Sequence, residues 1–117
     1  MIEMNKKKIL INGFGRIGRA VTKILIDQNI FDLIAINDKN PSIENMAYLY
    51  KYDSTYGVNC HDINVKNNHF VINGETISYH SNSDPVNTFK NLSEVDIVID
   101  CSGIAENINT YKYLLNK

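Results

Sequence analysis

The sequence lacks the features that mark secreted, membrane-bound and nucleic-acid-binding proteins. Its two cysteines, Cys60 and Cys101, are too few and too far apart for a disulfide framework or a zinc site, and they fit a reducing, cytoplasmic setting. The longest apolar run, Met46 to Tyr50, is far shorter than the roughly 20 residues of a membrane span. No signal-peptide-like apolar stretch follows the N-terminus. A net charge of −1 gives no reason to expect a nucleic acid or a membrane as partner.

The sequence also has no internal repeat, no low-complexity segment and no linker, so its 117 residues predict a single domain over 1–117. No spacing of His, Cys, Asp and Glu resembles a metal site, and no metal is expected. Adjacent side chains point apart, so Cys60-His61-Asp62 is interpreted as a surface loop and not as a catalytic trio. Cys101 is expected to be a small buried residue, and His69 and His80 are expected at the surface.

What the sequence does contain is a strand–helix–strand pattern at its start. Lys8–Asn12 and Leu33–Asn37 are short, apolar and rich in β-branched residues, which predicts two buried strands. Between them a helix is expected to run to about Gln28, because apolar residues recur three and four apart, at Ile17, Ala20, Val21, Ile24 and Leu25. This is the βαβ unit that places two parallel strands side by side.

The middle of the chain predicts a helix followed by antiparallel strands. Ser42 is a candidate N-cap for a helix through Lys51. Asn73-Gly74 is a strong turn signal, since both residues tolerate a positive φ. Strands are expected on both sides of that turn and before it, at Ile63–Lys66, His69–Ile72 and Thr76–His80.

The last part of the chain returns to the α/β pattern. Val95–Asp100 is another apolar strand, and a helix is expected over about 106–115. The predicted fold class is therefore α/β, a Rossmann-type doubly wound parallel sheet with an inserted antiparallel hairpin, incomplete at its C-terminus.

The turn after the first strand matches the dinucleotide fingerprint G-x-G-x-x-G. Gly13 permits the tight turn, Gly15 lets a pyrophosphate approach the backbone, and Gly18 allows close packing of helix on strand. The helix N-terminus offers free N–H groups to phosphates. The motif has the required context of a strand before it and a helix after it. The predicted phosphate-binding residues are Gly13, Phe14, Gly15, Arg16, Ile17 and Gly18.

Two further segments fit the same ligand. Asp38 ends the second strand about 20 residues after Gly18, where an acid meets the ribose hydroxyls of a dinucleotide. A carboxylate there favours NAD over NADP, while Lys39 beside it keeps NADP open as a second cofactor. Ser102-Gly103 follows a later strand, and such turns face the ligand in doubly wound sheets.

Taken in order along the chain, these segments resemble the cofactor half of phosphorylating glyceraldehyde-3-phosphate dehydrogenases. Lys51–Gly57 is similar to the family segment Lys-Tyr-Asp-Ser-x-His-Gly, with Tyr56 in place of the histidine. The other matching segments are Ile11–Arg19, Ala35–Asp38, Val71–Gly74, Asp84-Pro85 and Asp100–Gly103.

The resemblance implies a role for each matching residue. The N–H groups of Arg16 and Ile17 would hold the pyrophosphate, and Asn37 and Asp38 would flank the adenosine ribose. The segment around Ser83 would pass near the adenine. Ser102 and Gly103 would lie beside the dinucleotide, and the segment 52–57 would contribute to a homotetramer. Lys39 and Ala105 depart from the family pattern, which has apolar and aromatic residues at these positions.

No catalytic residue is assigned within this sequence. The family's catalytic cysteine lies in a Ser-x-Ala-Ser-Cys-Thr-Thr-Asn segment that the sequence does not contain. The chain is therefore expected to be the NAD-binding portion of a longer enzyme and inactive alone, with a sugar-phosphate substrate bound only by the full-length enzyme.

Three alternatives stay open at this point. The chain fits the cofactor half of erythrose-4-phosphate dehydrogenase, although that relative tends to have Glu where Asp38 stands. A non-catalytic nucleotide-binding or interaction module is the alternative from another class. A third is another Rossmann dehydrogenase, such as a semialdehyde or homoserine dehydrogenase, and the Tyr-Asp-Ser segment argues against it.

Overall fold

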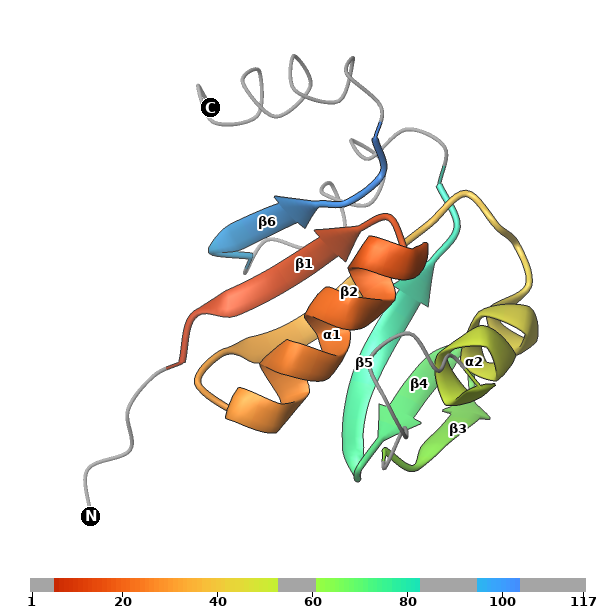
Figure 1. The fold of residues 1–117 in the computed structure, drawn as a ribbon, viewed down its shortest axis with the longest axis horizontal. Coiled ribbons are helices and arrows are strands. Elements are labelled where there is room, and N and C mark those ends of the chain that lie inside the picture. Colours follow the sequence, from red (N-terminus) through yellow and green to blue (C-terminus); the bar gives the residue numbers. More distant parts are fainter. Residues whose placement is uncertain (1–5, 53–60, 83–94, 104–117) are drawn as a thin grey trace.

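A computed structural model describes residues 6–52, 61–82 and 95–103. These residues form one twisted sheet with two helices over one of its faces (Figure 1). Ser83, Cys60, Ala105 and the helix expected over 106–115 lie outside the described residues. The elements in chain order are β1 Lys8–Asn12, α1 Arg16–Gln28, β2 Asp32–Asn37, α2 Ile43–Tyr52, β3 Ile63–Lys66, β4 His69–Ile72, β5 Glu75–His80 and β6 Ile97–Asp100.

The sheet has the strand order β3-β4-β5-β2-β1-β6. Strand β1 pairs in parallel with β2 on one side and with β6 on the other, and β2 pairs in parallel with β5. The pairs β3–β4 and β4–β5 are antiparallel. The α/β doubly wound fold with an antiparallel part is thus confirmed.

One detail of the expected sheet is corrected by the structure. The segment 76–80 was expected only as the returning strand of an inserted hairpin. Strand β5 does return antiparallel to β4, but its second half also pairs with β2, with Ala35 opposite Ser78 and Asn37 opposite His80. The hairpin strands therefore extend the parallel sheet directly, because β5 belongs to both parts.

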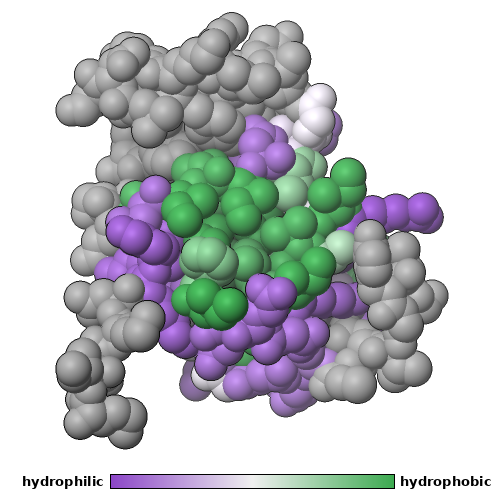
Figure 2. Space-filling view, turned by 60° about the vertical axis from the view of Figure 1, so that its left-hand side comes forward, coloured by the Kyte–Doolittle hydropathy of each residue, from purple (hydrophilic) through white to green (hydrophobic). Residues whose placement is uncertain are grey.

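Helix α1 connects β1 to β2 and packs on both strands (Figure 1). Ala20 and Leu25 are buried as the apolar spacing predicts, whereas Ile17 and Ile24 are 67% and 51% exposed. The buried residues of the helix include Gly18, Arg19 and Thr22 instead, because Gly18 must lie against the backbone of Gly13, just after β1. Figure 2 shows that apolar side chains gather on one side of the molecule, bordered by polar ones.

Helix α2 covers the other half of the same sheet face, over β3 and β4. It begins as expected after Ser42, whose Oγ accepts a hydrogen bond from the N–H of Asn45 at 3.1 Å. This is the side-chain cap that satisfies one free N–H of the first turn. Met46 and Tyr50 are buried on its inner side. Of the helices in the described residues, none has the length and apolarity needed to cross a membrane.

The core between helices and sheet is built from aliphatic strand residues and three stacked or tilted aromatic rings. The ring of Phe14 lies 5.9 Å from that of Tyr50, nearly parallel to it, and 5.5 Å from that of Phe70. All three side chains have no exposed surface. This packing fixes the position of the segment between β1 and α1, to which Phe14 belongs.

Candidate functional site

The carboxyl ends of four parallel strands meet at one edge of the sheet. Asn12 lies opposite Asn37 on one side and Asp100 on the other, and Asn37 lies opposite His80. From β1 the chain proceeds to β2 on one side and later returns to β6 on the other. In doubly wound sheets ligands bind in the crevice at such a reversal of strand order, outside the carboxyl ends.

The glycine turn fills the space between β1, β6 and α1. Gly13 has φ +102°, and a Cβ there would lie 2.6 Å from the backbone of Cys101 and Ser102. A Cβ on Gly18 would lie 1.9 Å from the carbonyl oxygen of Gly13. These two glycines therefore allow the backbone of β1, α1 and the segment after β6 to touch, in agreement with the roles predicted for them.

Gly15 has a different environment. A Cβ on Gly15 would meet nothing within 4 Å, so the protein's own packing in the described residues gives no reason for a glycine here. Gly15, Arg16 and Ile17 are all exposed, and they form the start of α1. Within the described residues no side chain caps this helix, and its first turn has no acidic residue. A helix N-terminus without a described cap, without an acidic first-turn residue and with space beside Gly15 suits the binding of a phosphate group.

The carboxylate of Asp38 is held next to this turn by two backbone donors. The N–H of Phe14 donates to its Oδ2 at 2.7 Å, and the N–H of Asn40 donates to its Oδ1 at 2.9 Å. The charge of Asp38 also acts on Tyr79: the pKa of that phenol is raised by burial first and by Asp38 second. Asp38 is half-buried and Lys39 is exposed. The structure thus brings the predicted acid and the predicted turn together through a hydrogen bond.

Asn37 lies beneath this site and is almost fully buried. Its amide nitrogen donates to Asn12 Oδ1 at 2.7 Å and to the carbonyl oxygen of Asn82 at 3.0 Å. Its Oδ1 accepts from the N–H of Asn82 at 3.1 Å. The side chain therefore links the ends of β1 and β2 to the segment after β5. These bonds fix the end of β2, directly before Asp38.

The segment after β6 closes the other side of the turn. The Oγ of Ser102 donates to Asp100 Oδ1 at 2.6 Å, and the N–H of Ser102 donates to the same oxygen at 2.8 Å. Gly103 has φ +73° and is exposed. Burial and the charge of Asp100 raise the pKa of the Cys101 thiol. A raised pKa favours the protonated thiol. Cys101 was expected to be a small buried residue, and it is half-buried.

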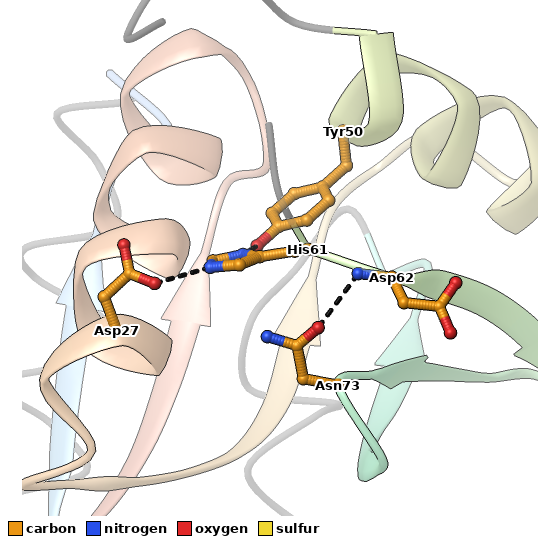
Figure 3. A network of polar contacts seen from close by, with 5 residues as sticks. All are labelled: Asp27, Tyr50, His61, Asp62 and Asn73. Carbon is orange, nitrogen blue, oxygen red and sulfur yellow. Dashed lines mark hydrogen bonds and ion pairs between the residues drawn. The ribbon is translucent and has the colours of Figure 1, made fainter. Parts of the chain in front are cut away.

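A polar network that was not expected from the sequence lies beside the aromatic cluster, and the expectation of a surface position for His61 was wrong. The side chain of His61 is only 7% exposed. Its Nδ1 lies 2.5 Å from the hydroxyl of Tyr50, and its Nε2 lies 2.6 Å from Asp27 Oδ1 (Figure 3). Its neighbour Asp62 is exposed, as expected. No local signal indicates this network, because its members come from α1, α2 and the segment before β3.

The expectation of surface positions for His69 and His80 was also incomplete, since both are half-buried. The Nε2 of His80 lies 3.0 Å from Ser78 Oγ, and burial and the nearby His69 lower the pKa of His80. The described residues hold no group of three or more His, Cys, Asp or Glu side chains able to bind a metal. An open groove between α2 and β3, lined by Tyr48, Tyr52 and Val65 among others, contains none of the predicted cofactor residues.

Comparison with known proteins was consistent with this geometry. Residues 7–108 match the family model described as glyceraldehyde 3-phosphate dehydrogenase, NAD binding domain. Glyceraldehyde-3-phosphate dehydrogenase 1 of Kluyveromyces lactis is 38% identical over 103 residues, which cover 88% of this chain and 31% of that protein.

Two other relatives give the same result. The enzyme of Cochliobolus heterostrophus is 40% identical over 97 residues, covering 83% of this chain and 29% of its own length. Glyceraldehyde-3-phosphate dehydrogenase 3 of Saccharomyces cerevisiae is 35% identical over 103 residues, covering 88% and 31%. The chain thus spans less than a third of the length of these curated relatives.

Proposed function

The chain belongs to the glyceraldehyde-3-phosphate dehydrogenase family through its NAD-binding domain, and from this premise we propose that it is the cofactor-binding portion of an enzyme that oxidatively phosphorylates glyceraldehyde 3-phosphate to 1,3-bisphosphoglycerate in glycolysis or gluconeogenesis. The observation that carries the proposal is the N-terminus of α1 beside the oriented carboxylate of Asp38: no described side chain caps this helix, and no described residue fills the space at Gly15. We further propose a cytoplasmic location and a homotetrameric parent enzyme.

The pyrophosphate is proposed to lie over the glycine turn. The N–H groups of Gly15, Arg16 and Ile17 would donate to its oxygens, since they start a helix that no described side chain caps. Gly13 and Gly18 contribute by letting the surrounding backbones approach. Phe14 contributes through its backbone and its anchoring ring, because its side chain has no exposed surface.

The adenosine ribose is proposed to lie against Asp38. Each carboxylate oxygen accepts one backbone N–H and has a further lone pair for a ribose hydroxyl. Asn37 would flank the ribose by fixing the strand end below it. Ser102 and Gly103 would lie beside the dinucleotide after β6, and Ser83 near the adenine is a proposal that rests on the family resemblance alone.

When bound, NAD supplies the hydride acceptor, and the residues of this chain bind and orient it. The groups that react with the aldehyde and with phosphate are proposed to come from the remainder of the parent enzyme. The chain alone is therefore expected not to reduce NAD when it is mixed with glyceraldehyde 3-phosphate and inorganic phosphate.

Calorimetric titration of the chain with NAD and then NADP tests the cofactor site and its selectivity. The wild-type chain should bind NAD saturably and NADP more weakly, because the Asp38 carboxylate repels a 2′-phosphate. Lys39 works in the opposite direction, so Lys39→Ala should widen the preference for NAD. Absence of NAD binding by the folded chain contradicts the proposal.

The variant Asp38→Ala tests the ribose contact. It should weaken NAD binding roughly 10-fold or more, since a charge-assisted hydrogen bond contributes about 1.5–3 kcal/mol, and it should weaken NADP binding much less. Asp32→Ala is the matched control, because Asp32 is an exposed acid at the opposite end of the same strand. Equal losses of NAD and NADP affinity would remove the ribose role.

A further inference from the structure

The side chains of Asp27, His61 and Tyr50 form a connected chain of hydrogen bonds between three segments (Figure 3). Asp27 lies near the end of α1, Tyr50 lies on α2, and His61 lies before β3. Burial first and the charge of Asp27 second raise the pKa of Tyr50, so the phenol keeps its proton. Because a carboxylate can only accept, the neutral tautomer with the proton on Nε2 satisfies both of these hydrogen bonds. Tyr50 then donates to Nδ1, and Nε2 donates to Asp27.

This arrangement of acid, imidazole and hydroxyl does not act on a substrate. Tyr50 has no exposed surface, and its hydroxyl is turned to His61 inside the protein. The exposed member is Asp27, whose side chain is 69% exposed. An ion pair with so exposed a partner contributes little to stability by itself. What the network does provide is a fixed orientation for the Tyr50 ring.

The Tyr50 ring packs against the glycine-rich segment through Phe14. It stacks on the ring of Phe14 with an interplanar angle of 10°, and Phe14 stands between Gly13 and Gly15. The backbone N–H of Phe14 donates to Asp38, and its carbonyl oxygen accepts from Arg19 Nη1 at 3.1 Å. A shift of the Phe14 ring would therefore move both the phosphate turn and the donor that orients Asp38.

We propose that His61, held by Asp27, is a positioning residue for the dinucleotide site, acting through Tyr50 and Phe14. The inference rests on the proposed NAD-binding function and adds to it a residue that touches no cofactor. Three observations carry it: the imidazole is buried, its two nitrogens link segments far apart in sequence, and the ring it orients packs on the turn itself.

The test compares NAD affinity in variants that remove one end of the Tyr50–His61 bond. His61→Leu removes the acceptor and Tyr50→Phe removes the donor while keeping the ring. Each should raise the NAD dissociation constant roughly 3-fold or more, with about 10-fold as the upper limit, because the loss transmitted to the site cannot exceed the free energy of one partly buried hydrogen bond. The double variant should lose no more than His61→Leu alone, because the bond that Tyr50→Phe removes is already broken in His61→Leu. His61→Asn keeps an acceptor near the Nδ1 position and should restore most of the affinity.

His69→Leu is the matched control, since His69 is another histidine with one short contact, to the carbonyl oxygen of Asn67 in the β3–β4 turn. It should leave NAD affinity unchanged. The amide resonance of Phe14 gives an independent readout, because its hydrogen bond to Asp38 is the last step of the path. That resonance should shift in His61→Leu and Tyr50→Phe and stay in place in His69→Leu.

The outcomes separate this inference from the function on which it rests. If wild-type chain fails to bind NAD, the proposed function is refuted and the inference with it. If wild-type chain binds NAD and folded Tyr50→Phe binds it equally well, with an unmoved Phe14 resonance, the inference alone is overturned. Lower melting temperatures with unchanged affinity would give His61 a purely structural role and would also overturn it.

Discussion

At the scale of single residues, the three glycines of the G-x-G-x-x-G motif occupy their positions for three different physical reasons. Gly13 combines a positive φ with backbone contact to the segment after β6, and Gly18 lies against the carbonyl oxygen of Gly13. Gly15 has φ −79°, and no atom of the described residues lies within 4 Å of the position a Cβ would take. The described fold gives no packing reason for glycine at position 15, whereas a bound pyrophosphate would require the space beside it.

This difference predicts opposite behaviour for two substitutions in the same turn. Gly15→Val should leave the chain folded and abolish NAD binding, because its side chain would occupy the space proposed for the pyrophosphate. Gly18→Ala should lower the free energy of unfolding by about 1–3 kcal/mol or more, the cost of overpacking a tight contact. Urea denaturation and NAD titration of both variants separate the two effects. Retained NAD binding in Gly15→Val would refute the phosphate role of the turn.

At the scale of elements, the antiparallel strands are set by two turns with left-handed residues. Asn67 and Asn68 connect β3 to β4, and Asn73 and Gly74 connect β4 to β5. All four have positive φ, between 49° and 84°. Two-residue turns of this kind match the twist of the strands they join, and Asn and Gly are the residues that tolerate them. The register of β5, and through it the pairing with β2, depends on these turns.

Gly74→Ala should therefore lower the free energy of unfolding by about 1–2 kcal/mol, the cost of a Cβ in the left-handed region. Asn67→Gly places the permissive residue in the other turn and should be neutral or slightly stabilising. Chemical denaturation of both variants measures the difference. A Gly74→Ala variant as stable as the wild-type chain would show that the turn does not hold this conformation in solution.

The free energy of unfolding is expected to depend on pH through His80, which lies on strand β5. Burial and the nearby His69 lower the pKa of His80 below its ordinary value of 6.5. The unfolded chain therefore takes up a proton at His80 before the folded chain does, so stability should fall as pH falls below about 6.5. His80→Gln should lose less stability than the wild-type chain between pH 7.5 and pH 5.5, measured by urea denaturation at both values. Parallel losses in the two proteins would exclude His80 as the cause.

At the scale of the whole molecule, the site belongs to no single element. The glycine turn, the end of β2 and the segment after β6 meet because four parallel strands end at the same edge of the sheet. The aromatic cluster then ties this edge to α2 and to the antiparallel strands. A ligand at the edge would contact segments from both ends of the described chain and should stabilise the fold as a unit.

NAD should accordingly raise the melting temperature of the chain in a concentration-dependent way. At 100 times the dissociation constant the gain is about 2.7 kcal/mol by mass action, which corresponds to roughly 10–20 °C for a domain of this size. Differential scanning calorimetry with increasing NAD measures the shift, and Gly15→Val should show none. A shift of equal size in Gly15→Val would mean that NAD binds elsewhere.

The sequence by itself determined the features that depend on neighbours along the chain. The βαβ unit, the glycine turn, the cap at Ser42 and the Asn73-Gly74 turn follow from spacing and from residues that tolerate particular backbone angles. The placement of Asp38 beside the turn was also predictable, because a βαβ unit of this length brings the second strand end to the first.

Only the tertiary structure decided the contacts between segments that no periodicity relates. These are the pairing of β5 with β2, the burial of Asn37 against Asn12 and Asn82, the outward direction of Ile17 and Ile24, and the link from His61 to Tyr50 and Asp27. The physical reason is that a local pattern fixes the period at which a segment buries its apolar residues, whereas the partner that satisfies a buried polar group is chosen by packing of the whole chain.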